Sequence, residues 1–329
     1  MSAETNKAVT LNVAPSPHLS NTGITTKRMM FDVIIALVPA VCVALFQFQW
    51  HAAQVISISI LSCMVAEALF TSLRGRKVTL GDGSAILTGL IFALSLPWST
   101  PWYVILIGAF VAIGLGKICF GGLGMNLFNP AMVGRAFVML SFAKSLGASA
   151  YVNSGSVLHV VTSATPLSQA KEAGQALGSE ILMPLFLGNV NGSLGEVSAL
   201  ALIIGGLYLC LRRVASWEIP LMVILATVVF GGLAQVCGLS SLTIPMHLFG
   251  GALMFGAFFI ATDPVTSPVT FKGKLWFGFG IGFFIVLLRV FSSYPEGVMF
   301  AVLLMNALVP LLNRWTIPTP VGGPFGGKK

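Results

Sequence analysis

Charged residues are scarce in this chain. Among its 329 residues only 9% are charged, whereas 56% are hydrophobic. A soluble domain has about a quarter of its residues as Asp, Glu, Lys or Arg. The chain therefore has too little charge to cover a water-facing surface of its size. Apolar runs of about 18 or more residues with almost no charge recur along it, which predicts helices that cross a membrane.

Motifs for metal and nucleotide binding are missing as well. The cysteines form no CxxC or CxxxC pair, and the histidines show no metal spacing. No Walker loop, dinucleotide fingerprint or Ser–His–Asp order occurs. The scattered cysteines are interpreted as small buried apolar side chains. An iron–sulfur cluster shared with other subunits is the alternative.

The net charge of +8 does not indicate nucleic acid, because the bases lie in short clusters between apolar segments. Such clusters set the orientation of membrane helices. With the N-terminus inside, most bases, Lys117 among them, fall on the cytoplasmic side, and only Lys144 and Lys171 fall outside. The first 28 residues hold no apolar signal segment and are predicted to be a cytoplasmic tail.

Ten apolar segments are predicted to span the membrane. Several are short and lie next to Pro or Gly, which indicates broken helices around a cavity. The predicted spans are 31–48, 52–73, 84–97, 101–119, 130–143, 195–211, 219–236, 247–262, 274–290 and 297–313.

Two of these spans resemble each other. Gly89 is followed by an apolar run, Pro97 and Pro101, and the same spacing recurs 167 residues later at Gly256, Pro264 and Pro268. The second copy lies five spans after the first, and this odd offset makes the two copies run in opposite directions, unless the similarity is chance. We therefore predict an all-α membrane fold of about ten helices in an inverted 5+5 repeat with broken helices. The predicted parts are a tail (1–28), a first repeat (29–143), an outer-face loop (144–194), a second repeat (195–313) and a cytoplasmic tail (314–329).

The outer-face loop carries the string Thr162-Ser163-Ala164-Thr165. This string resembles the flavin-attachment signature of two related membrane proteins, the D subunit of the Rnf ferredoxin:NAD oxidoreductase and the B subunit of the sodium-translocating NADH:quinone reductase. The resemblance implies FMN bound to Thr165 through a phosphoester that a flavin transferase makes. His159 departs from the family, which often has an acidic residue there. An exposed polar loop is the alternative.

The resemblance covers essentially the whole chain. It includes Ser16-Pro17-His18, the stretch Gly81–Ser84 and the stretch Gly121–Ala131. Length and layout suit the D subunit of Rnf. The resemblance implies a bacterial inner-membrane protein, the A, B, C, E and G subunits of the Rnf complex as partners, and no catalysis by this chain alone; the distribution of bases predicts that both termini are cytoplasmic.

The stretch from Gly121 to Pro130 cannot continue a helix, because it holds three glycines and a proline. Asn126 and Asn129 offer donors and acceptors that match the edge of an isoalloxazine ring. By resemblance they contact a non-covalent riboflavin. A structural helix break satisfied by its own amides is the alternative.

Several charged residues fall within or at the ends of predicted spans, where ionisable groups are usually paired or functional. Glu67 is a candidate for a sodium or proton site, or for an ion pair with Arg135 or Arg289. Arg135 is placed to neutralise a reduced flavin. Asp263 caps a helix break or contacts the flavin, and Asp32 faces water at the start of the first span.

The predicted function is an electron-transfer subunit of a redox pump that moves Na+ or H+. A flavin-free solute transporter or channel is the competing hypothesis, since inverted repeats with broken helices also describe transporters. A purely structural anchor for partner subunits is the third. Covalent flavin distinguishes the first from the others.

Overall fold

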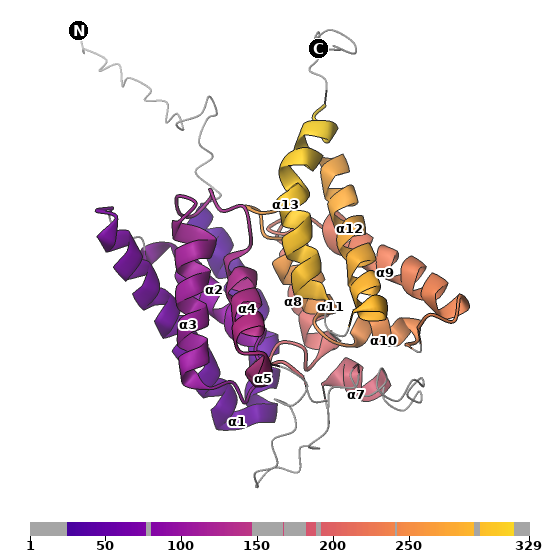
Figure 1. Cartoon of the computed structure of the whole chain (residues 1–329), viewed down its shortest axis with the longest axis horizontal. Coiled ribbons are helices and arrows are strands. Elements are labelled where there is room, and N and C mark those ends of the chain that lie inside the picture. The colour runs from indigo at the N-terminus through magenta and orange to yellow at the C-terminus, as the bar shows by residue number, and fades with distance from the viewer. Residues whose placement is uncertain are drawn as a thin grey trace, which may run out of the picture.

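The computed structural model describes residues 25–76, 80–146, 167, 182–188, 192–240, 242–292 and 297–318. Its secondary structure is helical throughout these ranges, apart from one isolated bridge between Pro97 and Ser193. We call residues 25–146 the first half and residues 182–318 the second half. The two halves lie side by side (Figure 1).

The first half begins with α1 (Thr26–Leu73), which turns back on itself. Gln49 has φ 47° and ψ −125°, and this kink separates the first two predicted spans. The half continues with η1 (Leu80–Asp82), α2 (Ser84–Leu94), α3 (Trp102–Ile113), the π-helix η2 (Gly114–Ile118), α4 (Pro130–Ser141) and α5 (Ala143–Leu146).

The second half contains a similar succession of helices. It comprises α7 (Leu182–Leu187), α8 (Ala199–Leu211), α9 (Glu218–Val236), α10 (Ile244–Phe249), α11 (Leu253–Phe255), the π-helix η5 (Gly256–Ile260), α12 (Phe271–Phe291) and α13 (Val298–Thr316). The start of α1 and the end of α13 lie at one end of the molecule, whereas α5, α7 and α10 lie at the other (Figure 1).

Four described helices, α1, α9, α12 and α13, are long and apolar enough to cross a membrane, and α2, α3 with η2, α4 and α8 are shorter apolar helices. Large apolar side chains also cover the outside of the molecule. Phe46, Leu211 and Val236 are 88%, 83% and 87% exposed. Water would oppose such exposure, whereas lipid would not. The predicted all-α membrane class is confirmed, while the number of ten spans and the inverted repeat stay predictions.

The two predicted breaks do end short helices. Helix α2 stops at Leu94, three residues before Pro97, and η5 stops at Ile260, four residues before Pro264. Backbone carbonyls at such an end need partners wherever water is excluded. At α2 the second half supplies them: Gly195 N donates to Leu94 O (2.6 Å) and Leu194 N donates to Leu96 O (3.0 Å). Residues 192–194, the end of the predicted outer-face loop, are thus buried against α2.

Two further polar contacts join the halves. Asn306 of α13 is fully buried, and its amide, oriented as its neighbours require, donates to Thr266 O (3.3 Å) and accepts from Asn129 N (3.2 Å). At the start of α1, Asp32 lies 3.3 Å from the guanidinium of Arg212. Asp32 therefore pairs with a base at the end of α8, although the sequence suggested that it faces water.

Candidate functional site

Lys117 is the least expected residue of the site. It lies in η2, where Cys119 N donates to Gly114 O in the i→i+5 pattern of a π-helix. Single π turns inside helices occur frequently at functional sites. The Lys117 side chain is only 2% exposed. Lys117 is counted among the bases on the cytoplasmic side, and that side stays a prediction; within the protein its side chain turns inward toward α1 and α2.

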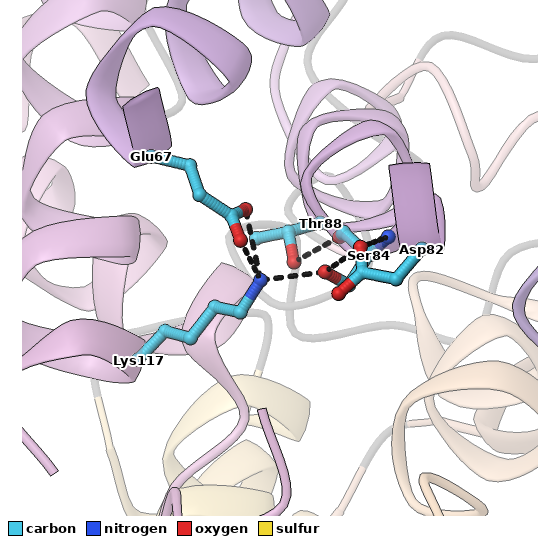
Figure 2. Close-up of polar contacts among 5 residues, drawn as sticks. All are labelled: Glu67, Asp82, Ser84, Thr88 and Lys117. Carbon is cyan, nitrogen blue, oxygen red and sulfur yellow. Dashed lines mark hydrogen bonds and ion pairs between the residues drawn. The ribbon is translucent and has the colours of Figure 1, made fainter. Parts of the chain in front are cut away.

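The ammonium of Lys117 is held by oxygen atoms from two other helices (Figure 2). Its Nζ lies 2.7 and 2.8 Å from the two carboxylate oxygens of Glu67 on α1, and 2.6 Å from Ser84 Oγ at the start of α2. An ammonium has three N–H donors, and these three contacts use all of them. The buried base paired with Glu67 is thus Lys117, which the sequence analysis did not offer as a partner.

The hydrogen bonds continue beyond Ser84. Ser84 Oγ donates to Asp82 Oδ1 (2.6 Å), Ser84 N donates to the same oxygen (2.9 Å), and Thr88 Oγ1 donates to Ser84 O (2.9 Å). Asp82 is partly exposed, whereas Glu67 is only 1% exposed. We call Asp82, Ser84, Lys117 and Glu67 the charge network. It connects a partly exposed carboxylate with a fully buried one.

The charge network borders a cavity. The walls of the cavity come from both halves: α1, α2, η2 and the Gly121–Asn129 stretch on one side, α8 and the η5–α12 connection on the other. Its lining includes Met29, Met30, Ser84, Thr88, Lys117, Asn126, Asn129, Phe259, Thr262 and Asp263. The space inside the cavity that water can enter is about 60 Å³. Small-molecule sites commonly measure roughly 300–1,000 Å³, so a ligand of that size requires the walls to move apart.

Asn126 and Asn129 do lie in the same cavity wall, but their amides play different parts. Asn129 Oδ1 accepts from Ala131 N (3.1 Å) and caps α4, as the helix-break alternative suggests. Asn126 Nδ2 donates to Phe128 O (3.2 Å). Asn126 Oδ1 is buried and has no hydrogen-bond partner among the residues that the structure describes. A ligand with an N–H group would fit this oxygen.

Asp263 lies in the opposite wall, in the connection between η5 and α12. Its carboxylate accepts from Val265 N (3.3 Å) and Thr266 Oγ1 (3.1 Å), which holds the turn after the helix break. Burial raises the pKa of the Asp263 carboxyl, and these two hydrogen bonds oppose the rise. Asp263 therefore both closes the turn and faces the cavity.

Arg135 and Arg289 serve other contacts. Arg135 of α4 lies 4.0 Å from Glu196 Oε1, and both side chains are buried. Arg135 is not among the residues that line the cavity. Arg289 of α12 donates to the carbonyls of His247 (2.5 Å) and Gly250 (2.8 Å) and thereby satisfies the end of α10.

The predicted flavin-attachment residues Thr162, Ser163, Ala164 and Thr165, and His159 near them, lie outside the described residues. Leu167 is described. It is buried in a small apolar cluster with Leu242 and Met246 of the second half. Met246 belongs to α10, which lies at the end of the molecule opposite the start of α1 (Figure 1). The cavity is not at the α10 end, since Met29 and Met30 at the start of α1 line it.

Sequence reasoning missed several polar residues of this region: Lys117, Thr88, Glu196 and Asn306. A signal did exist for Lys117. It is a single base in the run Gly114-Leu-Gly-Lys-Ile, where two glycines let other segments come close. A Cβ on Gly116 would lie 2.8 Å from Pro130 Cα, and one on Gly114 would lie 2.9 Å from the Phe70 ring.

The sequence is similar to known proteins over nearly the whole chain. The sequence model of the NQR2, RnfD, RnfE family matches residues 12–322. The chain is 38% identical to the D subunit of the proton-translocating ferredoxin:NAD(+) oxidoreductase complex of Clostridium ljungdahlii, over 94% of this chain and 96% of that protein. It is 39% identical to the Na(+)-translocating counterpart from Acetobacterium woodii, over 93% of each chain. It is also 38% identical to the D subunit of the ion-translocating oxidoreductase complex of Actinobacillus succinogenes, over 95% of this chain and 98% of that protein. Since the match extends from the first tail through α13, this chain belongs to the NQR2, RnfD, RnfE family.

Proposed function

We propose that this chain is the flavin-carrying D subunit, embedded in the membrane, of an ion-translocating ferredoxin:NAD+ oxidoreductase. The observation that carries the proposal is the likeness to such subunits over more than nine-tenths of both chains. The chain passes electrons across the membrane within the complex and is not catalytic alone. Its partners are the A, B, C, E and G subunits, and it lies in the bacterial inner membrane with both termini in the cytoplasm.

We assign two flavins to the chain. FMN is bound covalently to Thr165, and a riboflavin lies in the cavity beside Asn126 and Asn129. A flavin supplies one- and two-electron chemistry when it is bound. Asn126 Oδ1, which has no partner among the described residues, supports the cavity assignment, because it would accept a hydrogen bond from a ring N–H and thereby orient the ring.

The residues of this chain position the cofactor and exclude water from it. The cavity walls are largely apolar, with Met30, Val33 and Phe259 among them. Hydrogen bonds inside the cavity are stronger than in water, because the apolar walls lower the local dielectric constant. Asp263 and Lys117 lie in opposite walls, so a bound ring would have one acidic and one basic group beside it.

The coupling ion is left to experiment. The relatives named for proton and for sodium translocation are 38% and 39% identical to this chain, so overall likeness does not separate them. The buried charge network serves either ion, since a carboxylate binds a proton or a sodium ion.

Covalent flavin is the test of this function. The chain, purified from cells that contain the flavin transferase, is expected to give a fluorescent band on a denaturing gel and one FMN adduct by intact mass. Thr165→Ala should abolish both. Ser168→Ala, a nearby hydroxyl outside the signature, is the matched control and should keep both. A wild-type chain without any flavin would favour the solute transporter or channel instead.

A further inference from the structure

Lys117 belongs to two sites at once. Its ammonium forms the buried ion pair with Glu67, and its side chain lines the cavity that contains Asn126. The stem of lysine is flexible and its charge is compact, so the ammonium can change partners over a few ångströms. The position between two sites makes Lys117 a physical link between them.

We propose that Lys117 is a resident counter-cation. Its ammonium occupies a cation site made by Glu67 and Ser84, and a monovalent cation from solution replaces it there when negative charge arrives in the cavity. This inference rests on the proposed function, because it takes an electron carrier in the cavity as the source of that charge.

The oxygen atoms around Nζ form a built cation site. Two carboxylate oxygens and one hydroxyl lie 2.6–2.8 Å from the ammonium, and both Glu67 and Ser84 are almost fully buried. Hard oxygen ligands of this kind can bind a sodium ion, and the carboxylate of Glu67 by itself can bind a proton instead. A buried carboxylate that loses its partner must gain another cation, because an unpaired charge is costly there.

The charge network also connects the buried cation site to a partly exposed residue, from which a cation can enter. Asp82 is partly exposed, and Ser84 Oγ connects it to Lys117 Nζ through contacts of 2.6 Å on each side. The network has two carboxylates for one ammonium. When both are ionised its net charge is −1, which attracts a second cation. Asp82 therefore receives the cation, and Ser84 passes it toward Glu67.

Charge is conserved in the exchange. Before it, the ammonium of Lys117 balances Glu67. One electron, supplied by the oxidoreductase complex, then adds one negative charge to the cavity and draws the ammonium toward it. One cation from the Asp82 side takes the vacated place on Glu67. Each electron thus admits one cation, and departure of the electron returns Lys117 to Glu67 and releases the cation.

The test uses the whole complex reconstituted in lipid vesicles, with Lys117→Gln as the main variant. Uptake of radiolabelled sodium and a pH-sensitive dye together measure cations moved per electron. We expect this ratio to fall at least tenfold when it is compared between vesicles of equal non-covalent flavin content. The midpoint potential of the cavity flavin should become more negative, because the positive charge beside it is gone. Lys117→Arg should restore the potential, and the exposed Lys272→Gln is the matched control for charge loss.

An unchanged ratio of cations to electrons in flavin-replete Lys117→Gln would overturn the proposal. If that variant does not assemble, the double variant Glu67→Gln/Lys117→Gln removes both charges of the buried pair and leaves only the partly exposed carboxylate of Asp82; it too must lose cation transport. Wild-type complex without flavin would contradict the proposed function itself, so the two failures are distinguishable.

Discussion

Glu67 Oε1 lies 2.7 Å from Lys117 Nζ, and the two side chains are 1% and 2% exposed. An ion pair this deeply buried gives little net stability, since desolvation of both charges offsets their attraction. Removing one partner is far more damaging than removing both. The pair thereby makes its two members interdependent, which has a direct experimental consequence.

A double-mutant cycle should show this dependence. Lys117→Met and Glu67→Gln alone are each expected to destabilise the chain by about 3–5 kcal/mol, because each leaves a buried charge or donor unpaired. The double variant should be more stable than the sum of the two losses. Thermal unfolding in detergent measures the effect, and strictly additive losses would show that the two residues are not coupled.

The two asparagines of the cavity wall should separate in their effects. Asn126→Ala removes the unpartnered oxygen and the hydrogen bond from Nδ2 to Phe128 O, and is expected to lower non-covalent flavin content more than Asn129→Ala does. Asn129→Ala removes the cap of α4, which is worth about 1 kcal/mol, and should lower Tm. Flavin extraction and thermal unfolding of both variants check this pair. Equal flavin loss without any stability difference would contradict the separate roles.

Gly195 should tolerate no side chain. A Cβ there would lie 2.9 Å from Leu94 O, the carbonyl that Gly195 N itself satisfies. Gly195→Ala is therefore expected to cost about 1–3 kcal/mol through overpacking. Gly192→Ala is the control in the same segment, since its Cβ would meet Glu196 only at 3.6 Å. Similar unfolding temperatures for both variants would mean that the close approach is not needed.

Asn306 is expected to hold the two halves together. Asn306→Leu leaves Asn129 N and Thr266 O buried without the amide, a loss of about 1–3 kcal/mol. Asn313 also accepts a backbone hydrogen bond, from Val269 N, but in an exposed place. Asn313→Ala should therefore cost clearly less. Limited proteolysis between the halves and thermal unfolding would reveal the difference.

The membrane class was predictable because it follows from the scarcity of charged residues. This is a property of the composition and does not depend on how side chains pack. The helix breaks were predictable for a similar reason: Pro97 and Pro264 lack a backbone donor, and helices end before them. The position of the kink at Gln49 was predicted from the polar interruption between two apolar runs.

The site was predictable only in part. Asn126, Asn129 and Asp263 were singled out and do line one cavity. The inward direction of the Lys117 side chain was not predicted. It depends on the π-helical turn that contains Lys117, and the sequence does not encode that turn clearly. Which of the two amides caps a helix and which has a free oxygen likewise depends on three-dimensional packing. The role of Thr165 stays a prediction.

The hydrogen bonds from Leu194 and Gly195 to the end of α2 bear on how the protein is made. While the ribosome is still synthesising the first half, the carbonyls of Leu94 and Leu96 have not yet met their donors. Lipid cannot supply those donors. The nascent first half must therefore wait in the insertion machinery, or keep α2 near water, until residue 195 has emerged. A chain truncated before that residue would present a membrane-inserted helix whose end is never completed.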